Sequence, residues 1–201
     1  MSTPPAQTPD ARRQRQREEA RRTILDAAED LLVTGGFERF SMRKLAARCG
    51  YTPPTIYHYF HDKSGLLDAL VEERMSEAVE AFRRVRFGPD PVENLRRIFG
   101  AFAAWGTANP THYELLTVHR QRVEALPAGE EARALLEQAV DALHEAGRLR
   151  ADLELSRQAF WALVHGLISL RRSRPDVDWA PDLTDRAIDA MIDGLVLPEP
   201  R

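Results

Sequence analysis

Residues 41–60 read SMRKLAARCGYTPPTIYHYF. Two short helices are expected to start within this stretch, and they indicate the fold of the N-terminal part of the chain. Ser41 can cap the first helix, and Gly50 can end it in a left-handed conformation. Thr52 is a second N-cap, and Pro53 suits the first position of the next helix because its missing N–H would be unpaired there. Two short helices joined by a tight turn have the dimensions of a helix-turn-helix.

A helix of this size fits the DNA major groove, but a glycine between two short helices more often marks a plain helical hairpin. The run from Leu45 to Phe60, followed by Asp62-Lys63 and Leu66-Leu67, is more specific. It resembles the DNA-binding domain of the TetR/AcrR family, closely so from Arg22 to Leu70. Residues 160–167, FWALVHGL, resemble the Trp-His-Gly segment of one subgroup.

The resemblance implies an all-α fold, with a three-helix DNA-binding domain followed by a helical domain for effector binding and dimerisation. It implies phosphate contacts for some residues of the helix-turn-helix and base contacts for others, such as Thr55 and His58. The expected DNA-binding residues are Ser41, Arg43, Lys44, Tyr51, Thr52, Thr55, Tyr57, His58, Tyr59 and Lys63. Three alternatives stay open. Arg43 and Lys44 only solvate a helix face, Tyr57 packs inside the domain, or Lys63 pairs with Asp62.

Two departures from the family pattern change the expected phosphate contacts. Pro53-Pro54 removes two backbone donors from the helix end that usually attracts a phosphate. In the turn, Tyr51 stands where the family usually has a small aliphatic residue. Its ring and hydroxyl are therefore expected near either the DNA backbone or the domain core. We therefore expect Tyr57 and Lys63 to carry more of the phosphate contact. Cys49 is expected to pack.

The remaining sequence predicts further helices and no sheet, about nine helices in all. The expected domains are a disordered tail at 1–10, the helix-turn-helix domain at 11–62, the effector-binding and dimerisation domain at 63–197, and a short tail at 198–201. The expected helices are Arg13–Thr34, 41–50, 52–59, a long helix from Asp62 to the break at Gly88, Val92–Ala108, Thr111–Val123, Gly129–Ala146, Leu155–Arg172 and Leu183–Val196.

The net charge of −3 hides an uneven distribution. Residues 1–60 carry ten Lys/Arg against seven Asp/Glu, whereas residues 61–201 carry eighteen against twenty-four. The segment Arg12–Arg22 holds six arginines and two glutamates. Such a segment can neutralise DNA phosphates, or it can be a solvated tail, and charge alone does not decide between the two.

Two apolar stripes near the C-terminus are expected to form a homodimer interface, as the resemblance implies, or else an internal core. The expected interface residues are Phe160, Leu163, Val164, Leu167, Ile168, Ile188, Met191, Ile192 and Leu195. Aromatic and polar side chains between this region and the helix-turn-helix would suit a small, largely apolar effector, although such stripes are more often core. The candidate pocket residues are Phe99, Phe102, Trp105, Tyr113, His119, Trp161 and His165.

Other function classes find little support. No HExxH, P-loop, GxSxG or GxGxxG pattern occurs, so we expect no enzyme, no metal and no cofactor. One cysteine, no long apolar run and no signal-peptide pattern predict a cytoplasmic protein without a membrane partner. The expected protein is a homodimeric repressor that binds palindromic double-stranded operator DNA and responds to a small molecule. A helical protein-binding module is the main alternative.

Overall fold

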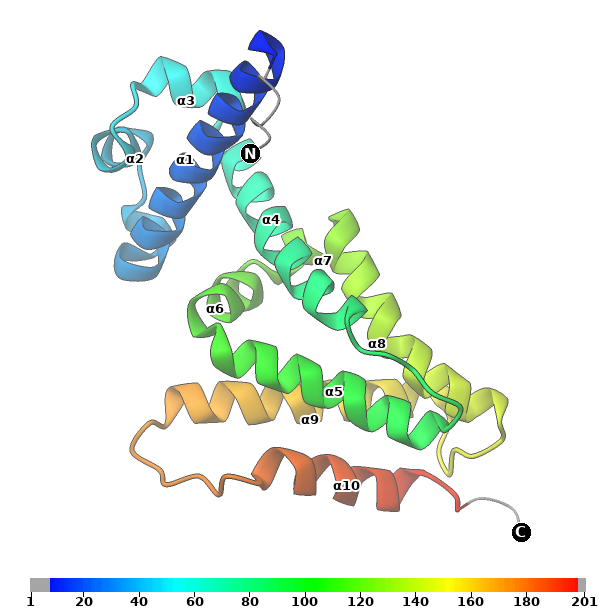
Figure 1. The fold of residues 1–201 in the computed structure, drawn as a ribbon. Helices are drawn as coiled ribbons and strands as arrows, with labels where there is room; N and C mark the ends of the chain where they lie inside the picture. The colour runs from blue at the N-terminus through cyan, green and yellow to red at the C-terminus, as the bar shows by residue number, and fades with distance from the viewer. Residues whose placement is uncertain (1–7, 199–201) are drawn as a thin grey trace, which may run out of the picture. The chain divides into compact units, whose positions relative to one another are not determined.

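The computed structural model describes residues 8–198, apart from the side chains of Phe37 and Glu38. Within these residues the chain forms ten α-helices and one isolated β-bridge, Leu149 to Val196, which confirms the all-α fold (Figure 1). The helices are α1 (Pro9–Arg39), α2 (Met42–Cys49), α3 (Pro53–Phe60), α4 (Lys63–Arg83), α5 (Pro91–Ala108), α6 (Pro110–Val118), α7 (Arg120–Glu124), α8 (Pro127–Glu145), α9 (Leu153–Ser173) and α10 (Leu183–Leu195).

The chain divides into two compact units, Met1–Val71 and Glu72–Arg201. The boundary falls inside α4, so one continuous helix belongs to both units. The predicted tail at 1–10 lies mostly outside the described residues, but Pro9 and Asp10 already form the first turn of α1. Most of the predicted tail at 198–201 also lies outside them.

The first unit is built on α1, α2 and α3. The regular part of α1 ends at Gly36, whose φ of 70° lies in the left-handed region that glycine tolerates best. Side chains from α1, α2, α3 and the start of α4 form its core. Its fully buried members are Ile24, Leu25, Ala28, Leu45, Ile56, Leu66, Leu67, Leu70 and Val71.

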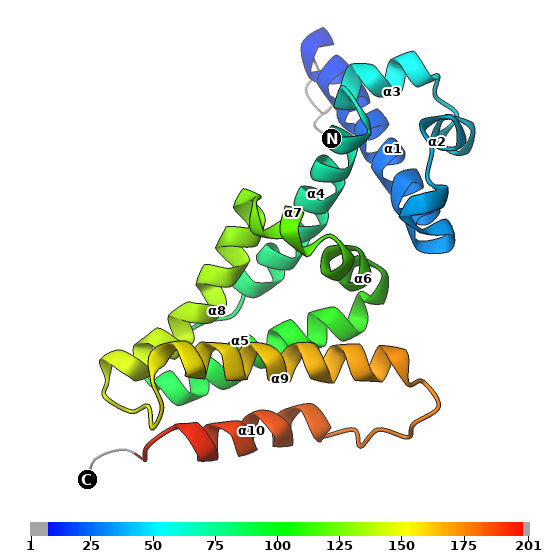
Figure 2. The same ribbon diagram turned by 180° about the vertical axis from the view of Figure 1, so that it is seen from behind.

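The second unit packs α5 against α8, α9 and α10, and α9 runs beside α10 in both views (Figures 1 and 2). The expectation of one helix from Thr111 to Val123 is wrong, because α6 ends at Val118 and α7 starts at Arg120. The apolar stripe of α6 stops there, since Val118 is 68% exposed. The break turns a new set of side chains, those of α7, in another direction.

No described helix combines the length and the apolar character that a membrane crossing needs. The described residues also contain no cluster of three or more His, Cys, Asp or Glu side chains placed to hold a metal ion.

Candidate functional site

The two short helices of the helix-turn-helix are capped as their sequence predicts. The Ser41 hydroxyl accepts a hydrogen bond from the Lys44 amide at 3.3 Å, and Gly50 ends α2 with a φ of 75°. The Thr52 hydroxyl accepts from the Thr55 amide at 3.4 Å. The two threonine hydroxyls also lie 2.8 Å apart. These caps fix where each short helix begins, and therefore which side chains each presents.

The start of α3 offers few backbone donors to a phosphate. Pro53 and Pro54 occupy its first two positions and have no N–H, and the amide of Thr55 already donates to Thr52. At the start of α2, by contrast, the amides of Met42 and Arg43 have no intrahelical acceptor because of their position. Backbone contacts to DNA are therefore more available at α2 than at α3.

The predicted DNA-binding side chains all belong to the first unit, and none of them is fully buried. Tyr57 is 44% exposed, which is unusual for a large ring and argues against the alternative that it packs. The exposed members of the set are Arg43, Lys44, Thr52, Tyr57 and His58. Its half-buried members are Ser41, Tyr51, Thr55, Tyr59 and Lys63.

The two lysines also make contacts within the unit. The Lys63 ammonium lies 5.2 Å from the centre of the Phe40 ring and donates to the Phe40 carbonyl at 3.4 Å. The Lys44 ammonium donates to the Arg39 carbonyl at 3.0 Å. Asp62, the alternative partner of Lys63, accepts from the Gly65 amide at 2.8 Å and so helps to start α4. Cys49 is half-buried, in agreement with a packing role.

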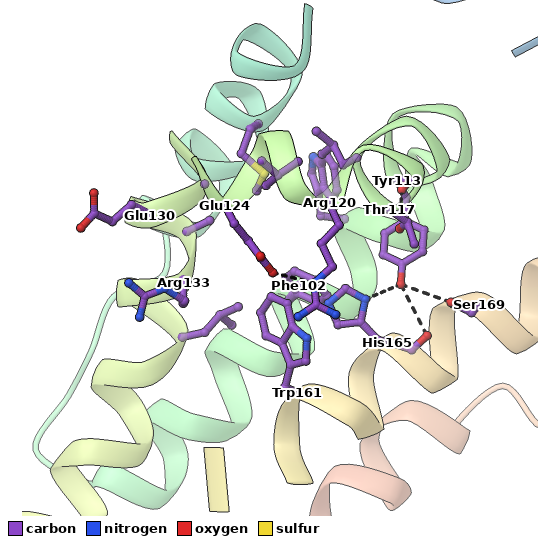
Figure 3. Close-up of a pocket in the computed structure, with 17 residues that line it drawn as sticks. Phe102, Tyr113, Thr117, Arg120, Glu124, Glu130, Arg133, Trp161, His165 and Ser169 are labelled. Atoms are coloured by element: carbon purple, nitrogen blue, oxygen red, sulfur yellow. Dashed lines mark hydrogen bonds and ion pairs between the residues drawn. The ribbon is translucent and has the colours of Figure 1, made fainter. Parts of the chain in front are cut away.

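The second unit encloses a cavity of about 360 Å³ (Figure 3). Five of the seven predicted pocket residues line it, namely Phe102, Trp105, Tyr113, Trp161 and His165. Phe99 instead borders a neighbouring hollow of about 200 Å³. His119 lines neither space. The other residues around the cavity are Met75, Leu116, Thr117, Arg120, Val123, Glu124, Gly129, Glu130, Ala132, Arg133, Leu136 and Ser169.

One wall of the cavity carries a hydrogen-bonded group built from α6 and α9. The Tyr113 hydroxyl and Nδ1 of His165 share a hydrogen bond of 2.6 Å, and Ser169 Oγ lies 3.3 Å from the same hydroxyl. Burial lowers the pKa of His165 to about 4, helped by the positive charge of Arg120, so its ring is neutral at pH 7. Its buried Nε2 has no hydrogen-bond partner among the described residues.

An exposed polar pair lies at the rim of the cavity. Arg120 Nε and Glu124 Oε1 are 2.6 Å apart, and both side chains reach towards Trp161 and His165 (Figure 3). Arg120, Glu124 and Trp161 border the second hollow as well, so this pair stands where the two spaces meet. Neither residue is predicted from the sequence as part of a pocket, because an Arg and a Glu four positions apart usually mark a solvated helix face.

Comparison with known proteins assigns the chain to a family. The family "Bacterial regulatory proteins, tetR family" matches residues 24–70, and "Tetracyclin repressor-like, C-terminal domain" matches residues 95–195. The chain belongs to the TetR family and is a DNA-binding transcription regulator, a class without enzymatic activity. The narrower resemblance of residues 160–167 to one subgroup stays a prediction.

Among the curated proteins, the chain is 31% identical over 75 residues to the HTH-type transcriptional regulator UidR of Escherichia coli K12, covering 37% of this chain and 35% of that one. It is 44% identical over 55 residues to the class A tetracycline repressor of E. coli, covering 27% and 26%. The chain thus matches about a third or less of the length of these relatives.

Solved structures resemble the chain over nearly its whole length. A TetR-family regulator from Marinobacter aquaeolei VT8 has a TM-score of 0.69 at 22% identity, covering 92% of this chain and all of that one. The FadR regulator of Bacillus subtilis in complex with stearoyl-CoA has a TM-score of 0.71 at 18% identity, covering 86% and 98%. At these identities the likeness establishes the fold.

Proposed function

We propose that the chain is a homodimeric repressor that binds a palindromic operator through α2 and α3 and responds to a small, largely apolar effector. The exposed face of α3 is the observation that supports the proposed DNA binding. A capped helix of this length, with Tyr57 and His58 turned to solvent, suits a major groove. Repression is the activity named for the class A tetracycline repressor, to which this chain is 44% identical over 55 residues.

Tyr57→Phe and Lys63→Ala are expected to weaken binding to all DNA sequences alike. Each change removes a phosphate donor, and α3 has few backbone donors that could replace it. Loss of the Lys63 charge should also lower the slope of log K against log salt by about 0.9, whereas Tyr57→Phe removes a neutral donor and should leave the slope nearly unchanged. Titrations of labelled operator at several salt concentrations measure the slope. A Lys63→Arg variant, which keeps the charge, is the control. An unchanged slope for Lys63→Ala would remove Lys63 from the set of phosphate contacts.

The homodimer is supported by the apolar surface of α9 and α10. Five of the nine predicted interface residues, Phe160, Val164, Ile168, Ile188 and Ile192, are buried within one chain and belong to its own core. The other four, Leu163, Leu167, Met191 and Leu195, are half-buried and remain available to a partner.

Helical spacing gathers these available residues into one surface. On α9, Leu163, Gly166, Leu167 and Leu170 fall on a single face, and Leu170 is 52% exposed. A side chain at Gly166 would meet no atom of the same chain within 4 Å, so another helix has room to approach. A second copy that covers this face would bury the exposed leucines and hold two helix-turn-helix units for one palindrome.

The effector proposal rests on the cavity of the second unit. Its walls are mainly aromatic and aliphatic, and its few polar groups converge from two sides, which is the usual character of a small-molecule site. The FadR structure of the same fold holds stearoyl-CoA, whose acyl chain is apolar, which is consistent with an effector that places an apolar part in this cavity.

Helix α4 offers a structural link between effector binding and DNA binding. Met75 of α4 lines the cavity, and the same helix continues into the DNA-binding unit. Two contacts tie α4 to α8: the Ala128 amide donates to the Glu72 carboxylate at 3.3 Å, and Arg83 forms an ion pair with Glu131 at 2.6 Å. A ligand that shifts α8 would therefore also move the part of α4 that belongs to the second unit.

A further inference from the structure

The first unit has a second polar feature besides the exposed face of α3. A hollow of about 560 Å³ lies between the N-terminal half of α1 and the end of α3, two segments that run close together in Figures 1 and 2. It is lined by Arg13, Gln14, Arg17, Glu18, Arg21 and Tyr59. Five of these residues come from α1, and Tyr59 comes from α3, the helix expected to read the operator.

Helix geometry separates the six arginines of Arg12–Arg22 into two groups. Arg13, Arg17 and Arg21 are four residues apart, so they share one face of α1 and span roughly 12 Å along its axis. Arg12, Arg15 and Arg22 fall on the other side of the helix and do not line the hollow. The sequence alone showed a basic segment, whereas the structure directs half of its arginines towards α3.

Arginines outnumber carboxylates in the lining of the hollow. Three arginines face one carboxylate, Glu18, which accepts a hydrogen bond from the Gln14 amide at 3.2 Å. Arg13 approaches Asp10 only at 3.9 Å, and both side chains are more than four-fifths exposed, so this pair neutralises little. Arg21 lies 5.8 Å from the centre of the Phe60 ring, which holds the arginine face against the end of α3.

We propose that this hollow, defined by Arg13, Arg17, Arg21 and Tyr59, is a second DNA contact that binds the phosphate backbone flanking the segment read by α3. The inference rests on the proposed operator binding. DNA is favoured over an acidic protein because Tyr59 belongs to α3, so the hollow borders the helix that is proposed to enter the major groove. Clustered guanidinium groups bind phosphates and displace their counterions.

The test compares two double variants of the 201-residue chain on two duplexes. Arg13→Ala/Arg17→Ala removes two charges from the hollow, and Arg12→Ala/Arg15→Ala removes two from the opposite side of the same helix segment. Alanine favours helix at all four exposed positions, so both variants should keep the fold. One duplex carries only the operator core selected from random DNA, and the other adds ten base pairs on each side.

On the long duplex, Arg13→Ala/Arg17→Ala is expected to lower the salt slope by about 1.8 per bound chain. The ratio of the two affinities, unaltered chain over variant, should then fall about twelvefold per bound chain when the salt concentration rises from 50 to 200 mM. On the short duplex the difference should largely vanish, and Arg12→Ala/Arg15→Ala should change either slope far less.

Equal losses in the two double variants would overturn the proposal, because the hollow would then have no special role. Unchanged binding of Arg13→Ala/Arg17→Ala to the long duplex would also overturn it, and would favour an acidic protein as the occupant. Both results leave operator binding itself intact. Failure of the unaltered chain to bind any DNA would instead refute the proposed function together with this contact.

Discussion

A Leu167→Arg variant is expected to be monomeric and to bind the palindromic operator at least about 100-fold more weakly, since linked half-site binding adds two or more orders of magnitude. Leu167 is half-buried on α9, in the middle of the surface proposed to meet a second copy. An arginine there can stay solvated in one chain, but a partner would bury its charge without a counter-charge. Analytical ultracentrifugation and operator titration measure the two effects.

Val118→Arg is the matched control for this change. Val118 is a more exposed apolar residue on α6, outside the proposed interface, so its replacement should leave both the dimer and operator binding unchanged. A Leu167→Arg protein that sediments as a dimer with normal affinity would refute the interface on α9 and α10. Retained helical circular dichroism in both variants separates lost dimerisation from unfolding.

A Gly129→Ala variant is expected to lose about 3 kcal/mol of unfolding free energy, because overpacking against backbone leaves little room for relaxation. Gly129 lies in the first turn of α8, and an added Cβ would meet the backbone carbonyl of Val123 in α7. Helix propensity alone would make the same change favourable by nearly 1 kcal/mol. The sign of the effect therefore reports whether α7 packs this closely on α8.

Thermal unfolding measures this effect, with an expected fall in Tm of roughly 6–12 °C for a chain of this size. Gly100→Ala is the control. Gly100 is inside α5, and a Cβ there would meet no atom within 4 Å, so that change should be neutral or stabilising by up to about 1 kcal/mol. Equal melting temperatures for Gly129→Ala and the unaltered chain would contradict the α7–α8 packing at the edge of the cavity.

The helix-turn-helix was predictable from sequence because its signals are local. Ser41, Gly50 and Thr52 act on their own neighbours through caps and a left-handed turn, and the structure has each of them in that role. The break between α6 and α7 was not predictable in this way. No glycine or proline lies between Thr111 and Val123 to mark it, and the helical spacing of these residues continues across it.

The two proposed sites of the second unit show what sequence periodicity cannot distinguish. A stripe such as Phe160, Val164 and Ile168 faces something apolar, but the spacing does not say whether that is the same chain or a partner. In the structure these three side chains pack inside one chain. Likewise, Arg120 and Glu124 form the exposed ion pair that their spacing predicts, and only the fold shows that this pair borders the cavity.

Selection of bound sequences from a pool of random duplex DNA tests whether α3 reads a palindromic operator as part of a dimer. We expect enrichment of two inverted half-sites whose centres lie about one helical turn or a multiple of it apart. Selection with a Thr55→Ala/His58→Ala variant should relax the sequence preference within each half-site. No enrichment, or an enriched site without inverted symmetry, would contradict the account.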